Sequence, residues 1–388
     1  MKNISANLIV ESIQKVTGKG PHQLHEPLFF GKEINYLKST IKGNSVSSTG
    51  KYVNKFEKKI KEYTKAKFAV AVVNGTQAIY ISLKACGVKR GQEVLVPALT
   101  FVGSVNAISY LGAEPHFVDS RINNFGINCP KLDIYLKKIT KFKGKKCINK
   151  LTGREIKAII PVHVFGQPCS IESIIEIAKK FNLLVIEDAA EALGSFYKKK
   201  HLGTFGDAGC ISFNGNKIIT TGGGGMVITN KKKLAKKIKH LTTTAKLQHK
   251  WEYLHDEVGY NFRMPNLNAA LGLAQLEKID IFLKAKRSLF KKYLNVFNNK
   301  KGIHLYKELQ NVSSNYWLQT LILDNSNKNL KNRILEKLHK KLIYARPAWK
   351  LISQHKPYKK NQKMNLSGAK EIYSKIINLP SSQSLVLK

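Results

Sequence analysis

Short runs of consecutive apolar residues alternate along most of the chain with longer stretches in which apolar residues recur at helical spacing. Near-continuous apolar runs are typical of strands buried on both faces, and the amphipathic stretches between them are typical of helices that cover a sheet. The alternation therefore predicts an α/β fold with a mostly parallel central sheet sandwiched by helices. The expected strands are 68–73, 93–97, 115–119, 157–162, 183–187, 210–213 and 226–229, and the first expected helices of this part are 32–42 and 51–64.

The pattern of apolar and polar residues is different at the two ends of the chain. Residues 1–30 predict a short helix followed by an extended arm, and the apolar positions of that helix are Ile4, Leu8, Ile9 and Ile13. After residue 266, the pattern predicts a long helix to Phe297, a strand at 316–323 and a helix at 330–342. We therefore expect an N-terminal helix and arm at 1–30, a large α/β domain at 31–265 and a smaller C-terminal α+β domain at 266–388.

The charge balance is unusual for a chain of 388 residues. A total of 66 lysines and arginines against 25 aspartates and glutamates gives a formal net charge of +41. Such an excess can attract nucleic acid or an anionic membrane surface. The lysines are spread over every segment, however, and no nucleic-acid-binding motif is present. We therefore expect no nucleic-acid partner, and we expect the positive field to favour an anionic substrate.

The five cysteines show neither C-x-x-C spacing nor a paired histidine pattern. This argues against a zinc site or a disulfide framework and suits a reducing compartment. The N-terminus lacks the features of a signal peptide, and no apolar run approaches the roughly 18 residues of a membrane span. We expect a cytoplasmic protein with no metal site and no membrane insertion.

Polar residues gather where the expected strands end. In open α/β sheets, ligands bind at the carboxyl ends of the strands. The residues found there are Asn74, Gly75, Thr76, Thr100, Phe101, His163, Asp188 and the stretch 212–217.

Gly75 and Thr76 lie where a strand passes into a helix. Free N–H groups, the positive end of the helix dipole and the Thr76 hydroxyl can form a phosphate site. An ordinary helix cap at Asn74 or Thr76 is the alternative. Ser212 can point a second hydroxyl into the same pocket, or it can be a buried serine bonded to the backbone.

Asp188 closes an apolar strand, where a carboxylate is partly desolvated and needs a positive partner. A protonated pyridine nitrogen would satisfy it, and an N-cap role on the next helix is the alternative. Phe101 could stack on a planar ring, although an aromatic residue after a strand is often part of the core.

Lys217 stands in a polar loop between two expected strands, and four consecutive glycines, 222–225, follow it. A glycine backbone can approach a ligand closely, so Lys217 is placed as a Schiff-base lysine would be. In a chain so rich in lysine, a merely solvated side chain is the alternative. A dense polar and aromatic run at 255–266 predicts a site or a subunit interface, since loops on a scaffold often carry function.

Six motifs follow one another along the chain. They are Asn-Gly-Thr-Gln-Ala at 74–78, Pro-Ala-Leu-Thr-Phe-Val at 97–102, Pro-Val-His-Val-Phe-Gly at 161–166, Glu-Asp-Ala-Ala-Glu at 187–191, Ser-Phe-Asn-Gly-Asn-Lys at 212–217 and Gly-Tyr-Asn-Phe-Arg-Met at 259–264. Together they resemble the sugar aminotransferases of the DegT/DnrJ/StrS type, from about residue 28 to residue 381. The resemblance implies an aminotransferase of fold type I that uses pyridoxal 5′-phosphate (PLP).

Carried over to this chain, the resemblance implies that Lys217 binds PLP as a Schiff base. Asp188 would pair with the pyridine nitrogen, and Phe101 would cover the ring. Position 191 is usually glutamine or histidine in the family, facing the phenolic oxygen of the ring. Glu191 departs from that pattern and needs a shared proton there.

The resemblance also implies a homodimer, because the phosphate would be held by residues of two subunits: Gly75, Thr76 and Ser212 of one, and Asn261 of the other. The segment 242–260 and the element 346–349 resemble a branch that aminates C4 of a UDP-2-acetamido-4-keto-2,6-dideoxyhexose, with L-glutamate as the donor, for glycan or nonulosonic acid biosynthesis. The expected substrate-binding residues are His163, His255, Arg263 and Arg346.

Three other functions are alternatives to this one. The first is amination of another nucleotide-linked keto sugar, of the GDP-perosamine type or with a C3 ketone. The second is a sugar dehydratase on the same fold, but these have histidine where this chain has Lys217. The third is a basic nucleic-acid-binding or structural protein, which the intact set of Lys217, Asp188, Thr76 and Ser212 disfavours.

Overall fold

Within residues 5–387, the part of the chain that the computed structural model describes, seven strands form the central sheet. The order is β1-β11-β10-β7-β6-β2-β3, and only β11 runs against its neighbours. The predicted mostly parallel sheet is confirmed. The bounds are β1 (Phe68–Val72), β2 (Glu93–Pro97), β3 (Glu114–Val118), β6 (Ile156–Ile159), β7 (Leu184–Asp188), β10 (Ala208–Ser212) and β11 (Gly225–Thr229).

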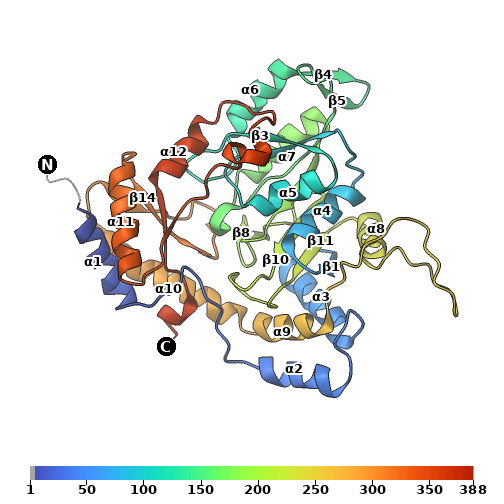
Figure 1. The fold of residues 1–388 in the computed structure, drawn as a ribbon, viewed down its shortest axis with the longest axis horizontal. Coiled ribbons are helices and arrows are strands. Elements are labelled where there is room, and N and C mark those ends of the chain that lie inside the picture. The colour runs from blue at the N-terminus through green and yellow to red at the C-terminus, as the bar shows by residue number, and fades with distance from the viewer. Residues whose placement is uncertain (1–4, 388) are drawn as a thin grey trace.

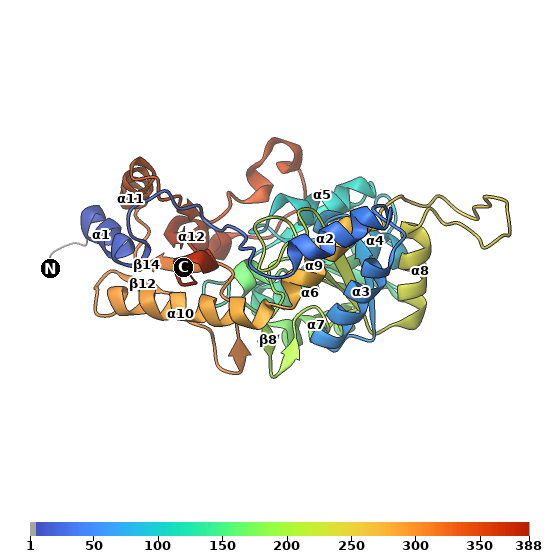
Figure 2. The ribbon, with the colours of Figure 1, turned by 90° about the horizontal axis from the view of Figure 1, so that it is seen from below.

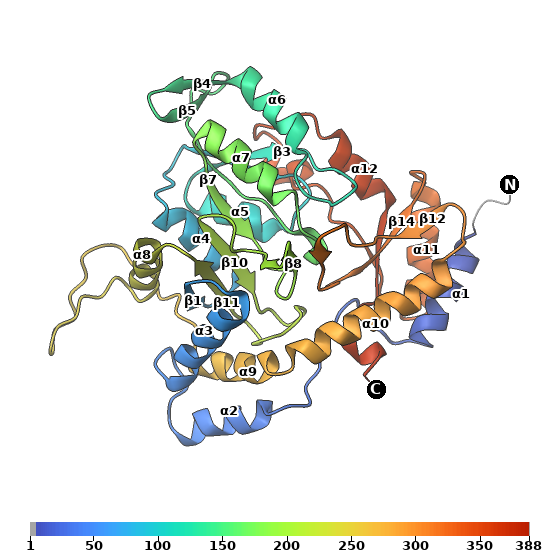
Figure 3. The ribbon, with the colours of Figure 1, turned by 180° about the vertical axis from the view of Figure 1, so that it is seen from behind.

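Helices cover both faces of the sheet: α4 and α5 lie on one face, and α6 and α7 on the other (Figures 1 and 3). The helices of the large body are α2 (Glu33–Lys42), α3 (Lys51–Thr64), α4 (Gly75–Ala85), α5 (Val102–Tyr110), α6 (Cys129–Ile139), α7 (Ile171–Phe181) and α8 (Lys232–Thr242). Their amphipathic spacing explains their orientation, since Val53, Phe56 and Ile60 of α3 all face inward and are buried. Among the described helices, none combines the length and the apolar character that crossing a lipid bilayer requires.

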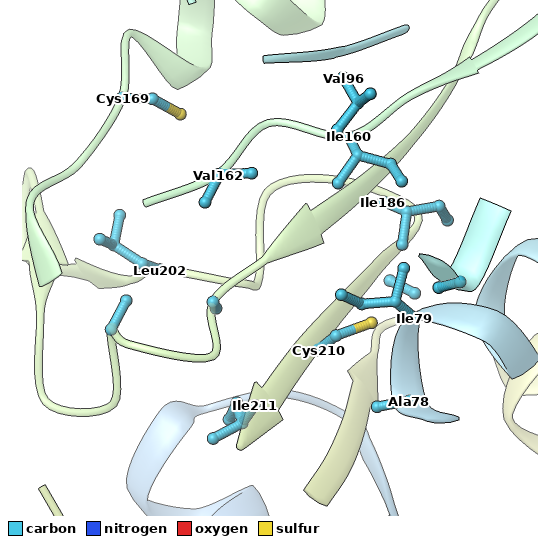
Figure 4. Packing of buried hydrophobic residues seen from close by; sticks show 14 of the residues in the cluster. Ala78, Ile79, Val96, Ile160, Val162, Cys169, Ile186, Leu202, Cys210 and Ile211 are labelled. Atoms are coloured by element: carbon cyan, nitrogen blue, oxygen red, sulfur yellow. The ribbon is translucent and has the colours of Figure 1, made fainter. Parts of the chain in front are cut away.

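The larger core lies between the sheet and its helices. Figure 4 shows Ile79 of α4 beside Cys210 of β10 and Ile186 of β7, and all three are buried in one cluster. Burial of a side chain of this size contributes roughly 1.5–3 kcal/mol. This packing fixes the start of α4 against the ends of β7 and β10, which is where the polar residues gather.

A second core lies in the smaller part of the molecule. It joins α1 (Ala6–Thr17) and α11 (Lys328–Lys340) to a four-stranded antiparallel sheet of order β12-β14-β16-β15. The strands are β12 (Ile303–Leu305), β14 (Gln319–Leu323), β15 (Arg346–Pro347) and β16 (Ile376–Leu379). The predicted apolar positions Leu8, Ile9 and Ile13 fall in α1, of which Ile9 and Ile13 are buried, and Ile4 lies outside the described residues.

The long helical pattern after residue 266 is two helices, α9 (Asn266–Leu276) and α10 (Ile279–Phe297), so the expected single helix is wrong. Helix α9 packs on α2 and α3, and Ala269, Ala270 and Leu273 belong to the larger core. Helix α10 starts in the larger core with Phe282 and ends in the second core with Phe297 (Figure 3). We therefore propose that the boundary between the two domains lies within α10 instead of at residue 266.

Smaller elements complete the fold. Strands β4 (Thr140–Lys143) and β5 (Lys146–Asn149) form a hairpin, and helix α12 (Ser367–Lys375) precedes β16. Strand β13 (Val312–Ser313) pairs with β8 (Phe196–Tyr197), which pairs with β9 (Lys200–His201). This three-stranded sheet ties the C-terminal part of the chain to the large body.

Candidate active site

A cavity of about 640 Å³ opens at the carboxyl ends of the central strands, as expected for an open α/β sheet. Both parts of the chain line it. The large body contributes Gly75, Thr76, Phe101, Ser104, Asp188, Glu191, Ser212 and Lys217, and the C-terminal part contributes Trp317, Arg346, Trp349, Lys350 and Asn378. The structure thus brings eight of the residues singled out in the sequence together: Gly75, Thr76, Phe101, Asp188, Glu191, Ser212, Lys217 and Arg346.

The N-terminus of α4 forms one wall of the cavity. Asn74 caps it, since its side-chain oxygen accepts a hydrogen bond from Gln77 N at 2.8 Å. Glycine at position 75 is required by packing, because a Cβ there would lie 2.8 Å from Ser212 Cβ. The helix terminus, with first-turn N–H groups that have no partner within the helix, therefore lies directly against the Ser212 hydroxyl. This arrangement can bind a phosphate.

A second close approach joins α5 to this wall. A Cβ on Gly103 would lie 2.6 Å from Thr76 Oγ1 and 3.2 Å from the Phe101 ring. Glycine at 103 thus lets the Thr76 hydroxyl and the Phe101 ring sit side by side at the cavity. The Phe101 side chain is 56% exposed, so its ring face is open on the cavity side.

Asp188 provides a buried carboxylate at the end of β7. Ser104 Oγ donates to its Oδ2 at 2.5 Å, and Ala190 N donates to its Oδ1 at 3.1 Å. Burial raises the pKa of Asp188 above its usual value, and these hydrogen bonds oppose that rise. A carboxylate in this position gains most from a positive partner in the cavity.

The Lys217 amine lies in the cavity beside a second buried carboxylate. Its Nζ is 3.2 Å from Glu191 Oε1, and the other oxygen, Oε2, accepts from Phe165 N at 2.8 Å. Desolvation raises the pKa of Glu191, and the lysine opposes that rise. The site therefore holds a primary amine next to a carboxyl group that can carry a proton closer to neutral pH than an exposed glutamate does.

The profile of the DegT/DnrJ/EryC1/StrS aminotransferase family matches residues 30–388. The chain belongs to this family. It is 40% identical to GDP-perosamine synthase of Escherichia coli O157:H7 over 365 residues, which cover 93% of each chain. It is 36% identical over 324 residues to GDP-perosamine synthase of Vibrio cholerae, covering 84% of this chain and 83% of that one.

Helicobacter pylori PseC, an aminotransferase involved in the biosynthesis of pseudoaminic acid, has the same fold. Its solved structure matches with a TM-score of 0.83 at 26% identity, over 93% of this chain and 94% of that chain. The protein is thus a transaminase of the DegT/DnrJ/EryC1/StrS family and has its fold, and its cofactor is PLP.

The residues of the cavity fit the cofactor of this family. The bare terminus of α4 and the Ser212 hydroxyl can hold a phosphate, and glycine at 75 leaves the space that a Cβ would fill. The buried Asp188 carboxylate can pair with a pyridine nitrogen, and the Lys217 amine can bind an aldehyde.

His163, by contrast, does not reach the cavity. Its ring is fully buried, and its Nε2 lies 3.0 Å from Glu187 Oε2. Because Cys169 N donates to Nδ1 at 3.3 Å, the ring proton is on Nε2 and is donated to Glu187. The expected substrate contact is therefore corrected to a structural one, behind the strand that ends in Asp188.

Arg263 is also turned away from the cavity. It is 8% exposed, its Nη1 bonds Glu57 on α3, and the same nitrogen donates to the Ala71 carbonyl of β1 at 3.3 Å. The side chain joins a helix to an edge strand. In place of the expected substrate contact we assign it this structural role.

His255 and Asn261 belong to an arm, residues 245–261, that follows α8 and projects from the body of the molecule (Figure 2). Asn261 is exposed and does not line the cavity of its own chain. His255 is exposed as well, and its Nδ1 bonds the Thr244 carbonyl at 2.8 Å. The arm thus points both residues away from their own site.

Two important residues of the site were not found from the sequence. Ser104 follows Thr100 by one helical turn directly after an expected strand, so that spacing was a usable signal. Trp317 lies 4.0 Å from the Lys217 amine, measured to the ring centroid. Since 100 residues of chain separate the two, no local pattern could have connected them.

Proposed function

We propose that this chain transfers an amino group from L-glutamate to a keto sugar carried on a nucleotide. The observation that carries the proposal is one cavity in which the Lys217 amine, the buried Asp188 carboxylate and the cradle of Gly75 and Ser212 face the same space. Each of these groups matches one part of PLP. Arg346 and Lys350 at the same cavity supply positive charge for an anionic substrate.

PLP supplies an electron sink that makes a C–H bond beside an amine nitrogen acidic. The negative charge of Asp188 would favour a protonated pyridine nitrogen and so keep the ring electron-poor, and Ser104 and Ala190 fix the direction of the carboxylate. Thr76 and Ser212 would bind the phosphate, and Phe101 would cover the ring. These residues orient the reacting atoms instead of reacting themselves.

Lys217 moves the proton. As a free amine it accepts a proton from the substrate carbon and returns it to a second carbon, which is general base and then general acid catalysis by the same nitrogen. Glu191 Oε1, 3.2 Å from that nitrogen, accepts a hydrogen bond from Lys217 Nζ and limits where the amine can swing. This gives the unusual Glu191 a role that glutamine could fill only in part.

A lysine replacement tests the proposal. The wild-type protein is expected to be yellow, with an absorption band of lysine-bound cofactor that borohydride fixes irreversibly, and Lys217→Ala is expected to lose both the band and the fixation. Glutamate should bleach the band of the wild type only. A colourless wild-type protein that takes up no PLP would contradict the proposal.

The preferred substrate that we propose is a GDP-linked keto sugar. Two relatives at 40% and 36% identity are named GDP-perosamine synthase, and the first is matched over nearly its whole length. A UDP-linked 2-acetamido-4-keto sugar is the second candidate, because the segments 242–260 and 346–349 resemble that branch. Specificity between such substrates depends on few contacts.

A panel of GDP-, UDP- and dTDP-linked keto sugars with glutamate, scored by product mass, separates the candidates. We expect the GDP-linked 4-keto-6-deoxy sugar to give the highest kcat/KM. Higher turnover of the UDP-linked N-acetyl sugar would make that sugar the preferred candidate. If none of the sugars were turned over while the PLP band was intact, both proposed substrates would be wrong although the cofactor is bound.

The active enzyme that we propose is a homodimer. Asn261 does not line the cavity of its own chain, and the arm that carries it exposes apolar side chains such as Trp251, Tyr253 and Val258, which are 75%, 77% and 79% exposed. Exposed apolar side chains that gather in one segment often mark a contact surface for another protein. A second copy that receives the arm would bury them and would bring Asn261 to the neighbouring phosphate cradle.

A further inference from the structure

The loop that carries Lys217 is fixed by side chains from the far end of the chain. The carbonyl of Asn216 accepts a hydrogen bond from the indole N–H of Trp317, with an Nε1–O distance of 2.7 Å. The carbonyl of Ile218 accepts one from Gln383 Nε2 at 3.1 Å. The lysine thus stands between two anchors. The anchor from Trp317 also touches the lysine side chain.

The indole ring of Trp317 contacts the amine directly. Lys217 Nζ lies 4.0 Å from the centroid of the ring, within the range of a cation–π interaction. Glu191 Oε1, at 3.2 Å, is the other group that holds the amine. A lysine side chain that is free to rotate loses conformational freedom when it is held in one geometry. These two contacts meet that cost before any ligand arrives.

Trp317 is itself held at both of its backbone polar groups. Its N–H donates to Asn315 Oδ1 at 2.8 Å, and its carbonyl accepts from Lys286 Nζ at 2.7 Å. Lys286 is fully buried, and desolvation lowers its pKa well below the usual value. Asn315 Nδ2 also donates to the Glu191 carbonyl at 2.8 Å. The indole and the carboxylate that hold the amine are therefore tied to each other.

From these contacts we infer that Trp317 is a positioning residue of the active site: its N–H holds the Lys217 loop, and its ring packs against the end of the Lys217 side chain and limits the directions that the side chain can take. This inference rests on the proposed function. Without the N–H the loop gains conformations, and without the ring the amine loses one of its two contacts. Both changes slow the return of the amine to the reactive geometry.

Two variants separate the parts of this role. Trp317→Phe keeps an aromatic face and removes the hydrogen bond to Asn216, and Trp317→Leu removes both. We expect added PLP to attach to Lys217 about fivefold more slowly in the first variant, the size of one lost hydrogen bond. A further loss of about fivefold is expected in the second, because the lysine side chain loses the ring against which it packs and is less often in the reactive geometry. Attachment is followed by the growth of the absorption band in the cofactor-free protein.

A second probe distinguishes positioning from general damage. Pyridoxamine 5′-phosphate carries an amine where PLP has its aldehyde, so its binding reports on the cradle and on Asp188 and does not depend on attachment to Lys217. We expect its Kd to stay within about twofold of wild type in Trp317→Phe, since none of the donors to the phosphate changes. A thermal midpoint measured on the same samples shows that the variants are folded.

The outcomes are distinguishable. Attachment at the wild-type rate in both variants would overturn the inference, as would a loss of pyridoxamine 5′-phosphate affinity that matches the loss of rate. A wild-type protein that neither attaches PLP nor binds pyridoxamine 5′-phosphate would instead overturn the proposed function.

Discussion

Gly75 is fixed by its surroundings, although its backbone geometry is not one that requires glycine. Its φ is not in the left-handed region, and the constraint is the 2.8 Å that would separate a Cβ from Ser212 Cβ. Both the helix backbone and the strand end would have to move to admit a methyl group. Gly75 is needed because the start of α4 lies so close to the end of β10, and this close approach forms the phosphate cradle.

Gly75→Ala is therefore expected to weaken PLP binding by about fivefold or more, because a clash of this kind costs about 1–3 kcal/mol or displaces the cradle. The measurement is a titration of the cofactor-free protein with PLP. Gly223→Ala is the matched control, since a Cβ there would meet only the Val73 carbonyl at 3.9 Å. Equal affinities of the two variants would contradict this account of Gly75.

At the scale of elements, the spacing of apolar residues predicted most of the helices and strands of the large body. The helix expected at 51–64 is α3 (Lys51–Thr64), and the strand expected at 93–97 is β2, because spacing and burial agree there. The break between α9 and α10, at Glu277 and Lys278, was missed, since no proline or glycine marks it.

The site divides in the same way. Residues at strand ends, such as Asp188 and Ser212, could be found because topology alone brings strand ends together. The sequence could not show that His163 and Arg263 lie outside the cavity. Packing decides whether a polar side chain near a strand end faces the cavity or a buried partner. Trp317 reaches the site only through the folding of the C-terminal part onto the large body.

The β8–β9 hairpin contains a histidine that links stability to pH. Burial lowers the pKa of His201 to about 4 from 6.5, and the neutral ring accepts from Gly194 N at 3.0 Å and donates to the Leu202 carbonyl. Between these two values the unfolded chain binds more protons than the folded one. Stability is therefore full above pH 6.5 and falls as the pH drops towards 4, by at most about 3 kcal/mol.

Urea unfolding at pH 7 and at pH 5 measures this effect. In His201→Gln the amide can make both hydrogen bonds without titrating, so the difference between the two pH values is expected to shrink. Replacement of the exposed His355, which lies outside the arm, by glutamine is the control and should leave the difference as in the wild type. An unchanged difference in His201→Gln would show that other groups cause the acid sensitivity.

At the scale of the whole molecule, the arm at 245–261 is the feature that a single chain leaves unexplained (Figure 2). Its middle part carries the exposed apolar side chains Trp251, Tyr253 and Val258, which belong to neither core, and it follows α8, whose lysine-rich face is solvated. An arm of this shape is suited to reach another molecule. The homodimer that we propose gives it a second copy of this chain to contact.

Replacing both Trp251 and Tyr253 by serine is expected to weaken the dimer at least tenfold, since two large exposed aromatic side chains would no longer be buried on association. Light scattering over a dilution series measures the change. Ile134→Ser, which removes an exposed apolar side chain on α6, is the control. A wild-type protein that stays monomeric at every concentration would contradict the proposed homodimer.

The anchoring of the Lys217 loop also has a consequence for how the protein is made. Synthesis runs from the N-terminus, so Lys217 leaves the ribosome long before Trp317 and Gln383, the residues that fix its loop. A growing chain has the amine and the phosphate cradle but not their final arrangement. The fully anchored arrangement of the site thus forms only after almost the last residue has been added, and a prematurely ended chain lacks the contacts that fix the Lys217 loop.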